Sequence, residues 1–171
     1  MVGHTPSVDS RILRNAMGNF CTGVTVITAV DGDTPLGFTC QSVTSVSLNP
    51  SLVSFCPAKT STTWPLLKKS RRLCINILSH DQQDLCLGFA RSGENKFDNV
   101  EWESAGNLAP RLSGALAHIE ATIVAEHDAG DHVIVLASVT DVGVDDSKGP
   151  LLFYRGGFDL SRPMSGTTSR M

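Results

Sequence analysis

The chain has 171 residues, enough for one domain with a sizeable core, and its formal net charge is −3 at pH 7. With 41% hydrophobic and 18% charged residues, it has the composition of a globular protein rather than of a disordered segment. The acidic balance and the lack of a basic stripe in the sequence argue against nucleic acid as a partner.

The predicted elements begin with a helix, because apolar residues recur at helical spacing over residues 11–20. Alternation over residues 22–30 predicts a strand, and the sequence DGDTPLG at residues 31–37 predicts a turn. The alternation resumes over residues 38–48 and predicts a single strand there. A short buried strand is expected over residues 52–56, closed by a proline.

Two further helices are expected in the middle of the chain. Hydroxyl residues at 61–63 offer N-caps for a helix that starts at Trp64 and ends near Lys68 and Lys69. A second helix opens with a capping box formed by Ser79 and Gln82. A long polar connection then covers residues 91–110, and connections of that length are often functional.

The rest of the chain is nearly all strand. Alternation predicts strands over residues 72–78, 114–128, 132–144 and 150–158. Gly130 and Asp131 stand where a hairpin turn belongs. Because strands dominate and no βαβ rhythm occurs, the sequence predicts a mainly β fold, an antiparallel β-barrel with short flanking helices.

The five cysteines indicate a reducing compartment, since they are widely spaced among apolar residues and form no metal-ligand pattern. The N-terminal stretch MVGHTPSVDS has no apolar signal core, and no stretch approaches the roughly 18 apolar residues of a membrane span. We therefore expect a cytoplasmic protein with neither a metal site nor a membrane segment. The polar residues 1–10 and 161–171 are expected to be flexible ends.

No established nucleotide-binding or hydrolytic motif occurs in the chain. The patterns GxGxxG, GxxxxGK[ST], HExxH and GxSxG are all missing from the sequence. If this protein binds a nucleotide, it does so without a Rossmann or P-loop cradle.

The predicted strand over residues 38–48 is unusual, because polar side chains interrupt both of its faces. A strand that packs on a core normally has one clean apolar face. Two interpretations stay open. The strand either lies at a partly exposed edge, or it lines a polar slot in which hydroxyls, an amide and backbone N–H groups contact a ligand.

The sequence AKTSTTWP at residues 58–65 combines a cation, Lys59, with hydroxyls and the start of a helix. This combination suits an anion such as phosphate, and a well-capped helix is the alternative interpretation. His132 has two interpretations as well, a half-exposed residue at the start of a strand or a residue held over a ligand by the preceding turn. Arg91 and Arg155 are either surface cations or phosphate-binding forks.

The ordered set of motifs resembles the short-chain flavin reductase family, in particular the reductase component of two-component flavin-dependent monooxygenases. The segments that carry the resemblance are FCTGVTVIT, GFTCQSVTSVSLNPSLV, INILSHDQQDLCLGFA, ENKF, GALAHIEA, AGDH and PLLFYRGGF. They extend over residues 11–160, and we expect these residues to form one domain. Each motif is weak alone, whereas the whole set in this order is specific.

The resemblance implies an antiparallel Greek-key split barrel of the FMN-binding type, which forms a homodimer. It implies hydride transfer from NADH, or in some members NADPH, to FMN or FAD, followed by release of reduced flavin to a partner monooxygenase. That partner would hydroxylate an aromatic, steroid-ring or antibiotic-pathway substrate. Two alternatives remain: a non-catalytic flavin-binding module, and an enzyme like pyridoxine-phosphate oxidase, which shares the barrel type.

The resemblance also implies which residues meet the cofactors. Those expected beside the flavin ring are Thr39, Cys40, Gln41, Ser42, Thr44 and Ser45. Those expected at the phosphate or adenosine part are Lys59, Thr60, Ser61 and Thr62. Phe89 and Ala90 would form a wall near the cofactor, Arg91 would bind the cofactor beside them, and Tyr154 and Arg155 would close the site. Asp131 and His132 would lie beside the nicotinamide, where we expect His132 to position the ring rather than to transfer a proton. Many relatives have Ala-Asn where this chain has Cys40 and Gln41, so the contact of the longer Gln41 differs.

Overall fold

A computed structural model describes residues 8–93, 95–145 and 147–158 of the chain. The chain divides into two compact units, one formed by residues 23–151 and the other by residues 1–22 together with 152–171. Of the predicted flexible ends, 1–10 and 161–171, residues 1–7 and 161–171 lie outside the described residues.

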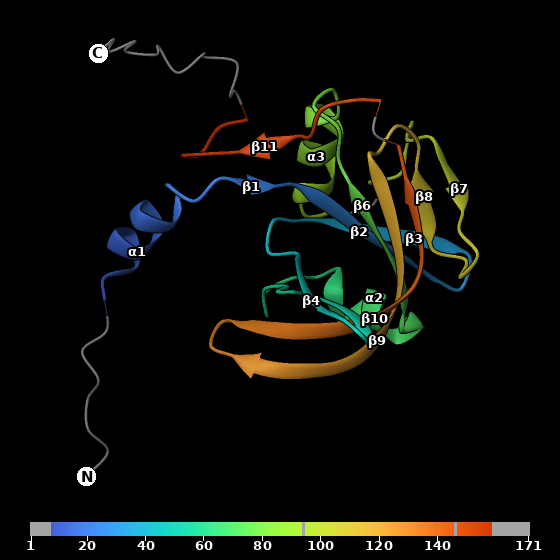
Figure 1. The fold of residues 1–171 in the computed structure, drawn as a ribbon, viewed down its shortest axis with the longest axis horizontal. Coiled ribbons are helices and arrows are strands. Elements are labelled where there is room, and N and C mark those ends of the chain that lie inside the picture. The colour runs from blue at the N-terminus through green and yellow to red at the C-terminus, as the bar shows by residue number, and fades with distance from the viewer. Residues whose placement is uncertain (1–7, 94, 146, 159–171) are drawn as a thin grey trace. The chain divides into compact units, whose positions relative to one another are not determined.

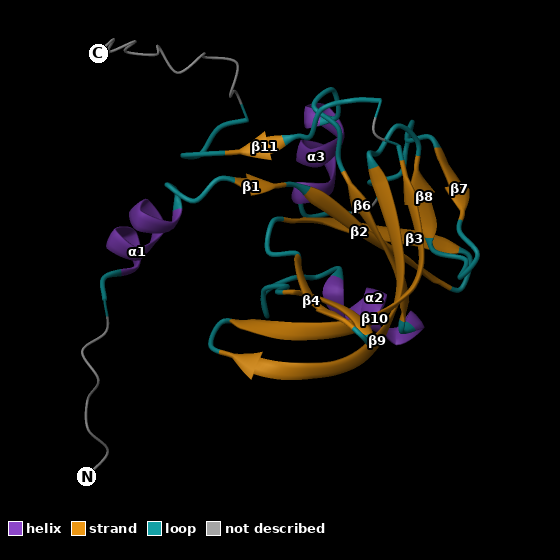
Figure 2. Ribbon diagram, viewed as in Figure 1, coloured by secondary structure: helices purple, strands orange, loops and turns teal. Residues whose placement is uncertain are grey.

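The larger unit is built on one seven-stranded antiparallel sheet (Figure 1). Its strands, in spatial order, are β3 (Thr34–Cys40), β2 (Thr25–Asp31), β6 (Arg72–Ile77), β9 (Ala117–Ala129), β10 (His132–Val144), β5 (Ser51–Phe55) and β4 (Thr44–Leu48). The strands curve strongly in Figure 2, as they do in a barrel. The prediction of a mainly β, antiparallel split barrel with short helices is confirmed.

The single strand predicted over residues 38–48 is wrong, because the chain changes partner in the middle of it. Cys40, the last residue of β3, pairs with Thr25 of β2, whereas Thr44, the first residue of β4, pairs with Ser54 of β5. The two strands are the two edges of the sheet, and residues 41–43 connect them. A connection this short brings the two edges close together, so the barrel is split between β3 and β4.

Strands β9 and β10 form a long hairpin, and its turn is the predicted one. The ladder starts at the pair Ala129 and His132, which leaves Gly130 and Asp131 as the two turn residues. Gly130 has a φ of +68°, a value that glycine adopts without steric cost. Irregularities in the register at Leu136 and near Val139 bend the hairpin around the barrel.

The helices are short. They are α1 (Ser10–Met17), α2 (Trp64–Leu67), the 3-10 helix η1 (Lys68–Ser70) and α3 (Gln83–Ala90). The predicted capping box is wrong as a helix start, because α3 begins at Gln83 and its N-cap is Gln82. The Gln82 side chain still accepts a hydrogen bond from the Ser79 N–H at 3.1 Å, while the Ser79 hydroxyl donates to Asp81 and to the Gly114 carbonyl. None of the helices in the described part of the chain is long and apolar enough to cross a bilayer.

Four short strands complete the fold. They are β1 (Thr22–Gly23), β7 (Trp102–Ser104), β8 (Pro110–Leu112) and β11 (Leu152–Phe153), of which β7 pairs with β8. The expected long connection over residues 91–110 therefore contains β7 and ends on β8. The strand predicted over residues 150–158 is reduced to Leu152–Phe153.

The hydrophobic core contains a cluster of three aromatic side chains. The rings of Phe55 and Trp64 meet edge to face with their centroids 5.5 Å apart, and Phe38 packs against both. Phe55 is fully buried, which stabilises the fold by about 1.5–3 kcal/mol relative to an exposed ring. Because Trp64 is the first residue of α2, this contact also fixes the short helix to the barrel.

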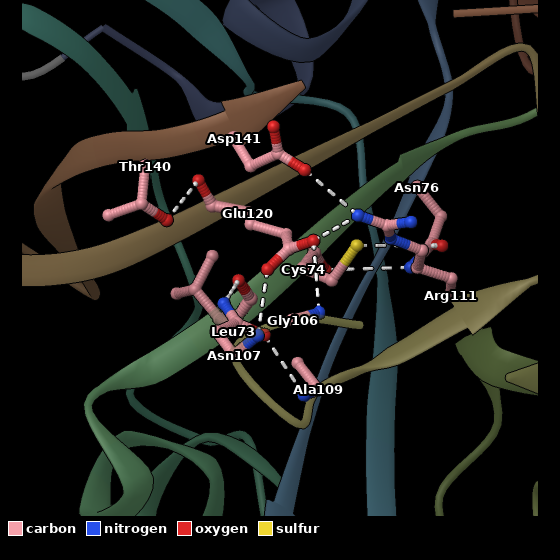
Figure 3. Close-up of polar contacts among 10 residues, drawn as sticks. All are labelled: Leu73, Cys74, Asn76, Gly106, Asn107, Ala109, Arg111, Glu120, Thr140 and Asp141. Carbon is pink, nitrogen blue, oxygen red and sulfur yellow. Dashed lines mark hydrogen bonds and ion pairs between the residues drawn. The ribbon is translucent and has the colours of Figure 1, made fainter. Parts of the chain in front are cut away.

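A buried ion pair fastens the long connection to the barrel (Figure 3). The carboxylate of Glu120, on β9, is only 4% exposed, and it accepts hydrogen bonds from the N–H groups of Gly106 and Asn107 at 3.3 and 2.8 Å. It also pairs with Arg111 of β8, whose guanidinium reaches the exposed Asp141 at 3.0 Å. The connection is therefore an ordered part of the barrel wall.

Candidate functional site

A cavity of about 600 Å³ opens in the larger unit, in the range that small-molecule and cofactor sites occupy. Four parts of the chain line it: the end of β3 with the residues that follow, the segment between β5 and α2, the end of α3 with the start of the long connection, and the first residue of β10. The partner change after Cys40 places residues 41 and 42 on this cavity instead of in a strand.

Many of the residues predicted from sequence line this one cavity. They are Thr39, Cys40, Gln41, Ser42, Thr60, Ser61, Thr62, Phe89, Ala90, Arg91 and His132. As the first interpretation of the polar strand predicts, β3 and β4 are edge strands, and Gln41 and Ser42 between them line the cavity in which the second interpretation places a ligand.

Of the remaining predicted residues in the larger unit, Thr44, Ser45, Lys59 and Asp131 do not line the cavity. Thr44 and Ser45 lie exposed on β4. The Lys59 ammonium pairs with Asp128 at 2.5 Å. Tyr154 and Arg155 belong to the smaller unit, where the Arg155 guanidinium donates to the Asn19 side chain at 2.6 and 2.9 Å.

The expected anion site at residues 58–65 is only partly assembled. Lys59 is engaged by Asp128, and α2 has four residues, which is too short to offer a strong dipole. The Ser61 hydroxyl accepts a hydrogen bond from the Trp64 N–H at 3.1 Å, as in the capping interpretation. The segment supplies the cavity with hydroxyl groups and backbone rather than with a lysine.

His132 is held at the cavity by the hairpin turn. Its Nδ1 lies 2.7 Å from a carboxylate oxygen of Asp131, and this hydrogen bond lowers the pKa of Asp131. Because a carboxylate only accepts, Nδ1 carries the hydrogen and Nε2 keeps a lone pair in the neutral ring. The turn itself is fastened to the neighbouring segment between β5 and α2, since the Lys59 N–H donates to the Asp131 carbonyl at 2.9 Å.

An aromatic side chain forms one wall of the cavity. Phe89, in the last turn of α3, is 1% exposed, and the ring of Phe97 meets it edge to face at 5.0 Å. The Thr39 hydroxyl donates to the Cys86 carbonyl at 2.6 Å and so ties β3 to the same helix. These contacts fix Phe89 and the end of α3 in the wall of the cavity.

The cavity offers cations, hydroxyls and an aromatic face, but no carboxylate among its lining residues. Arg91 and Lys96 supply its positive charge, and His132 supplies an imidazole ring. Burial raises the pKa of the Cys40 thiol, which keeps it protonated and a poor nucleophile. The donor set fits a planar, negatively charged ligand better than a substrate that needs nucleophilic attack.

Sequence reasoning missed several lining residues. They are Phe38, Cys56, Pro57, Ala58, Thr63, Ser92 and Lys96. Most of them are adjacent in the sequence to a predicted site residue, so the predicted segments already pointed to their positions. Lys96 is different, because it stands within the long polar connection, and the segment ENKF was the only sequence feature that pointed to it.

Comparison with known proteins identifies relatives of the whole chain. The family model described as "Flavin reductase like domain" matches residues 17–160. The reductase subunit HsaB of a flavin-dependent monooxygenase from Rhodococcus jostii is 41% identical over 157 residues, which cover 92% of this chain and 80% of HsaB. The FMN reductase (NADH) SmoA of Agrobacterium fabrum is 42% identical over 150 residues, covering 88% of this chain and 85% of SmoA.

Solved structures agree with these relatives. A homologue of nitrilotriacetate monooxygenase component B from Mycobacterium thermoresistibile is 39% identical with a TM-score of 0.86, covering 95% of this chain and 92% of that one. The NADH:FAD oxidoreductase SgcE6 of Streptomyces globisporus, solved in complex with NAD and FAD fragments, is 34% identical with a TM-score of 0.84, covering 95% of this chain and 100% of SgcE6. The chain therefore belongs to the family of flavin reductase like domains.

Proposed function

We propose that this protein is an NADH-dependent flavin reductase that transfers hydride from NADH to FMN or FAD and supplies the reduced flavin to a partner flavin-dependent monooxygenase. The observation that carries the proposal is the cavity, which gathers predicted flavin-site residues from four separate segments in a chain of this family. SmoA is named as an NADH-dependent FMN reductase and HsaB as the reductase subunit of a monooxygenase, which supports both halves of the proposal.

The two cofactors would supply the hydride donor and acceptor, so the chain needs to stack and orient two rings. Phe89 is buried behind one wall of the cavity and would keep that wall in place. Gln41 and Ser42, freed from strand pairing, offer polar groups at the cavity edge. Preorganised N–H donors there would favour the negative charge that a flavin gains on reduction.

His132 would position the nicotinamide. Asp131 holds its Nδ1 and so limits rotation of the ring, which leaves Nε2 as the nitrogen available for a ligand. No step of hydride transfer requires a general base, so the imidazole would act by contact and orientation. Arg91 is the one arginine among the lining residues, and this scarcity supports NADH over NADPH, whose extra phosphate needs cationic partners.

We also propose a homodimer in the cytoplasm. Apolar side chains are exposed on the larger unit, among them Val46, Leu48 and Val144, and none of the side chains of α1 is buried. Such surfaces commonly mark an interface between copies. All five cysteines, which lie among the described residues, are free thiols, as in reducing compartments. Sedimentation of the purified protein tests the oligomeric state.

The direct test is a steady-state assay with purified protein, NADH or NADPH, and free FMN or FAD. Catalytic loss of NADH that depends on added flavin is the expected result, with NADPH used more slowly. A flavin that binds and never turns over would identify a non-catalytic flavin-binding module instead. Oxidation of pyridoxine phosphate without use of NADH would identify an enzyme like pyridoxine-phosphate oxidase.

A further inference from the structure

Lys96 lies at the point where three walls of the cavity meet. Its ammonium donates to the Gly37 carbonyl of β3 at 3.3 Å, to the Phe89 carbonyl of α3 at 3.1 Å and to the Thr63 hydroxyl before α2 at 3.4 Å. The three acceptors are distant from one another in sequence, and each belongs to or adjoins a lining segment. One side chain therefore joins three elements that no backbone ladder joins to one another.

The hydrogen bonds use all three donors of the ammonium. Every acceptor is a neutral oxygen, so Lys96 has no donor left over for a direct hydrogen bond to a ligand. The Phe89 carbonyl is one of the last in α3, a place where a lysine both satisfies a free carbonyl and complements the helix dipole. This geometry indicates that Lys96 affects ligand binding indirectly, by fixing the positions of the lining segments.

Lys96 also differs in environment from the lysines on the surface. Lys68, Lys69 and Lys148 each pair with a carboxylate at 2.8–3.4 Å. Lys96 is part-buried, its burial lowers its pKa, and no carboxylate of the described residues lies within ion-pair distance of it. Burying the Lys96 ammonium costs solvation free energy. The ammonium adds positive charge to a cavity that has no carboxylate among its lining residues.

We propose that Lys96 is a positioning residue of the flavin site, which holds β3, α3 and the segment before α2 at the separation that flavin binding requires. The inference rests on the proposed function. The Phe89 carbonyl accepts a hydrogen bond from Lys96, Phe89 is one of the lining residues, and Gly37 lies directly against the Phe89 ring. Loss of the ammonium would leave buried oxygens without donors and let the walls move apart, which weakens flavin binding.

The test compares three variants with the wild type in FMN titrations followed by flavin fluorescence, and in steady-state kinetics. K96M keeps the length of the side chain and removes the donors and the charge, whereas K96R keeps the charge. K69M is the matched control, because Lys69 is 59% exposed and lies outside the cavity. Circular dichroism at the assay temperature checks that each variant is folded.

K96M should bind FMN about tenfold more weakly, as expected for the loss of buried hydrogen bonds, while the KM for NADH stays within about twofold. K96R should recover part of the affinity, and K69M should match the wild type. FMN binding by K96M equal to that of the wild type, or an equal loss in K96M and K69M, would overturn the inference.

If K96M does not fold, T63V serves in its place, because valine keeps the shape of threonine and removes one acceptor of the ammonium. T63V should weaken FMN binding by about threefold, and unchanged binding would overturn the inference. A wild type that binds FMN but never oxidises NADH refutes the proposed function alone, since the positioning role is still judged from FMN affinity. A wild type that binds no flavin refutes both.

Discussion

Gly37 of β3 lies directly against the ring of Phe89: a Cβ added at Gly37 would stand 2.7 Å from Phe89 Cε1 and 3.3 Å from the Ile27 carbonyl oxygen. The ring has little freedom to retreat, because it is 1% exposed and packs edge to face on Phe97. The absence of a side chain at Gly37 therefore sets where the aromatic wall of the cavity stands.

The G37A variant should lose about 1–3 kcal/mol of unfolding free energy, because the methyl group displaces a packed ring. FMN binding should weaken with it, since the displaced ring lines the cavity. Urea denaturation and FMN titration measure the two effects. G88A is the control, because a Cβ at Gly88 of α3 meets nothing within 4 Å and alanine favours a helix. Equal stabilities of G37A and G88A would contradict the packing argument.

The H132A variant tests the role of the histidine at the cavity. We expect the KM for NADH to rise or kcat to fall by about tenfold through loss of ring orientation, while FMN affinity stays nearly constant. H127A is the control, since His127 is exposed and pairs with Ile134 farther along the same hairpin. Steady-state kinetics with each substrate varied in turn gives the answer, and wild-type kinetics in H132A would refute the role.

The E120Q variant tests the buried ion pair behind the long connection. Removing the charge leaves the Arg111 guanidinium without its buried partner, and we expect a loss of about 3 kcal/mol in unfolding free energy. D141N removes only the exposed partner of Arg111 and should cost less than about 1 kcal/mol. Chemical denaturation of both variants measures the difference. Similar losses of unfolding free energy in the two variants would mean that the buried Glu120 carboxylate contributes no more to stability than the exposed Asp141.

The contact between Asp81 and Lys148 should make the stability depend on pH. Hydrogen bonds from Lys148 and then from Ser79 lower the pKa of Asp81 to about 2. A lowered pKa stabilises the fold above the pKa of the unfolded chain, about 4, and this contribution is lost as the pH falls toward about 2. D81N should therefore melt at a lower temperature than the wild type at neutral pH, and the gap should close in acid. A gap that is constant from pH 6 to about 2.5 would exclude this origin.

Some elements could be predicted from the sequence because local patterns decide them. The strand over residues 132–144 has the predicted bounds, since a turn of Gly130 and Asp131 precedes a continuous alternation. The hydroxyls and the amide of residues 39–42 raised the question of a ligand slot because they interrupt both faces of an apparent strand. In the structure these residues line the cavity.

Other features depend on contacts that are distant in sequence. The break between β3 and β4 contains no glycine or proline, and only the pairing of β3 with β2 and of β4 with β5 reveals it. Lys96 resembles any solvated lysine of a polar loop until β3 and α3 bring two carbonyls to it. The role of a residue that acts by joining elements becomes visible only once those elements are placed.

The most direct test of the account is a single turnover without oxygen, in which the protein, FMN and NADH are mixed and the absorbance of oxidised flavin is followed. We predict that the flavin is reduced rapidly, with one NADH consumed for each FMN, and that the same mixture without protein reacts far more slowly. Bound flavin that stays oxidised in the presence of excess NADH would contradict the proposed reductase function.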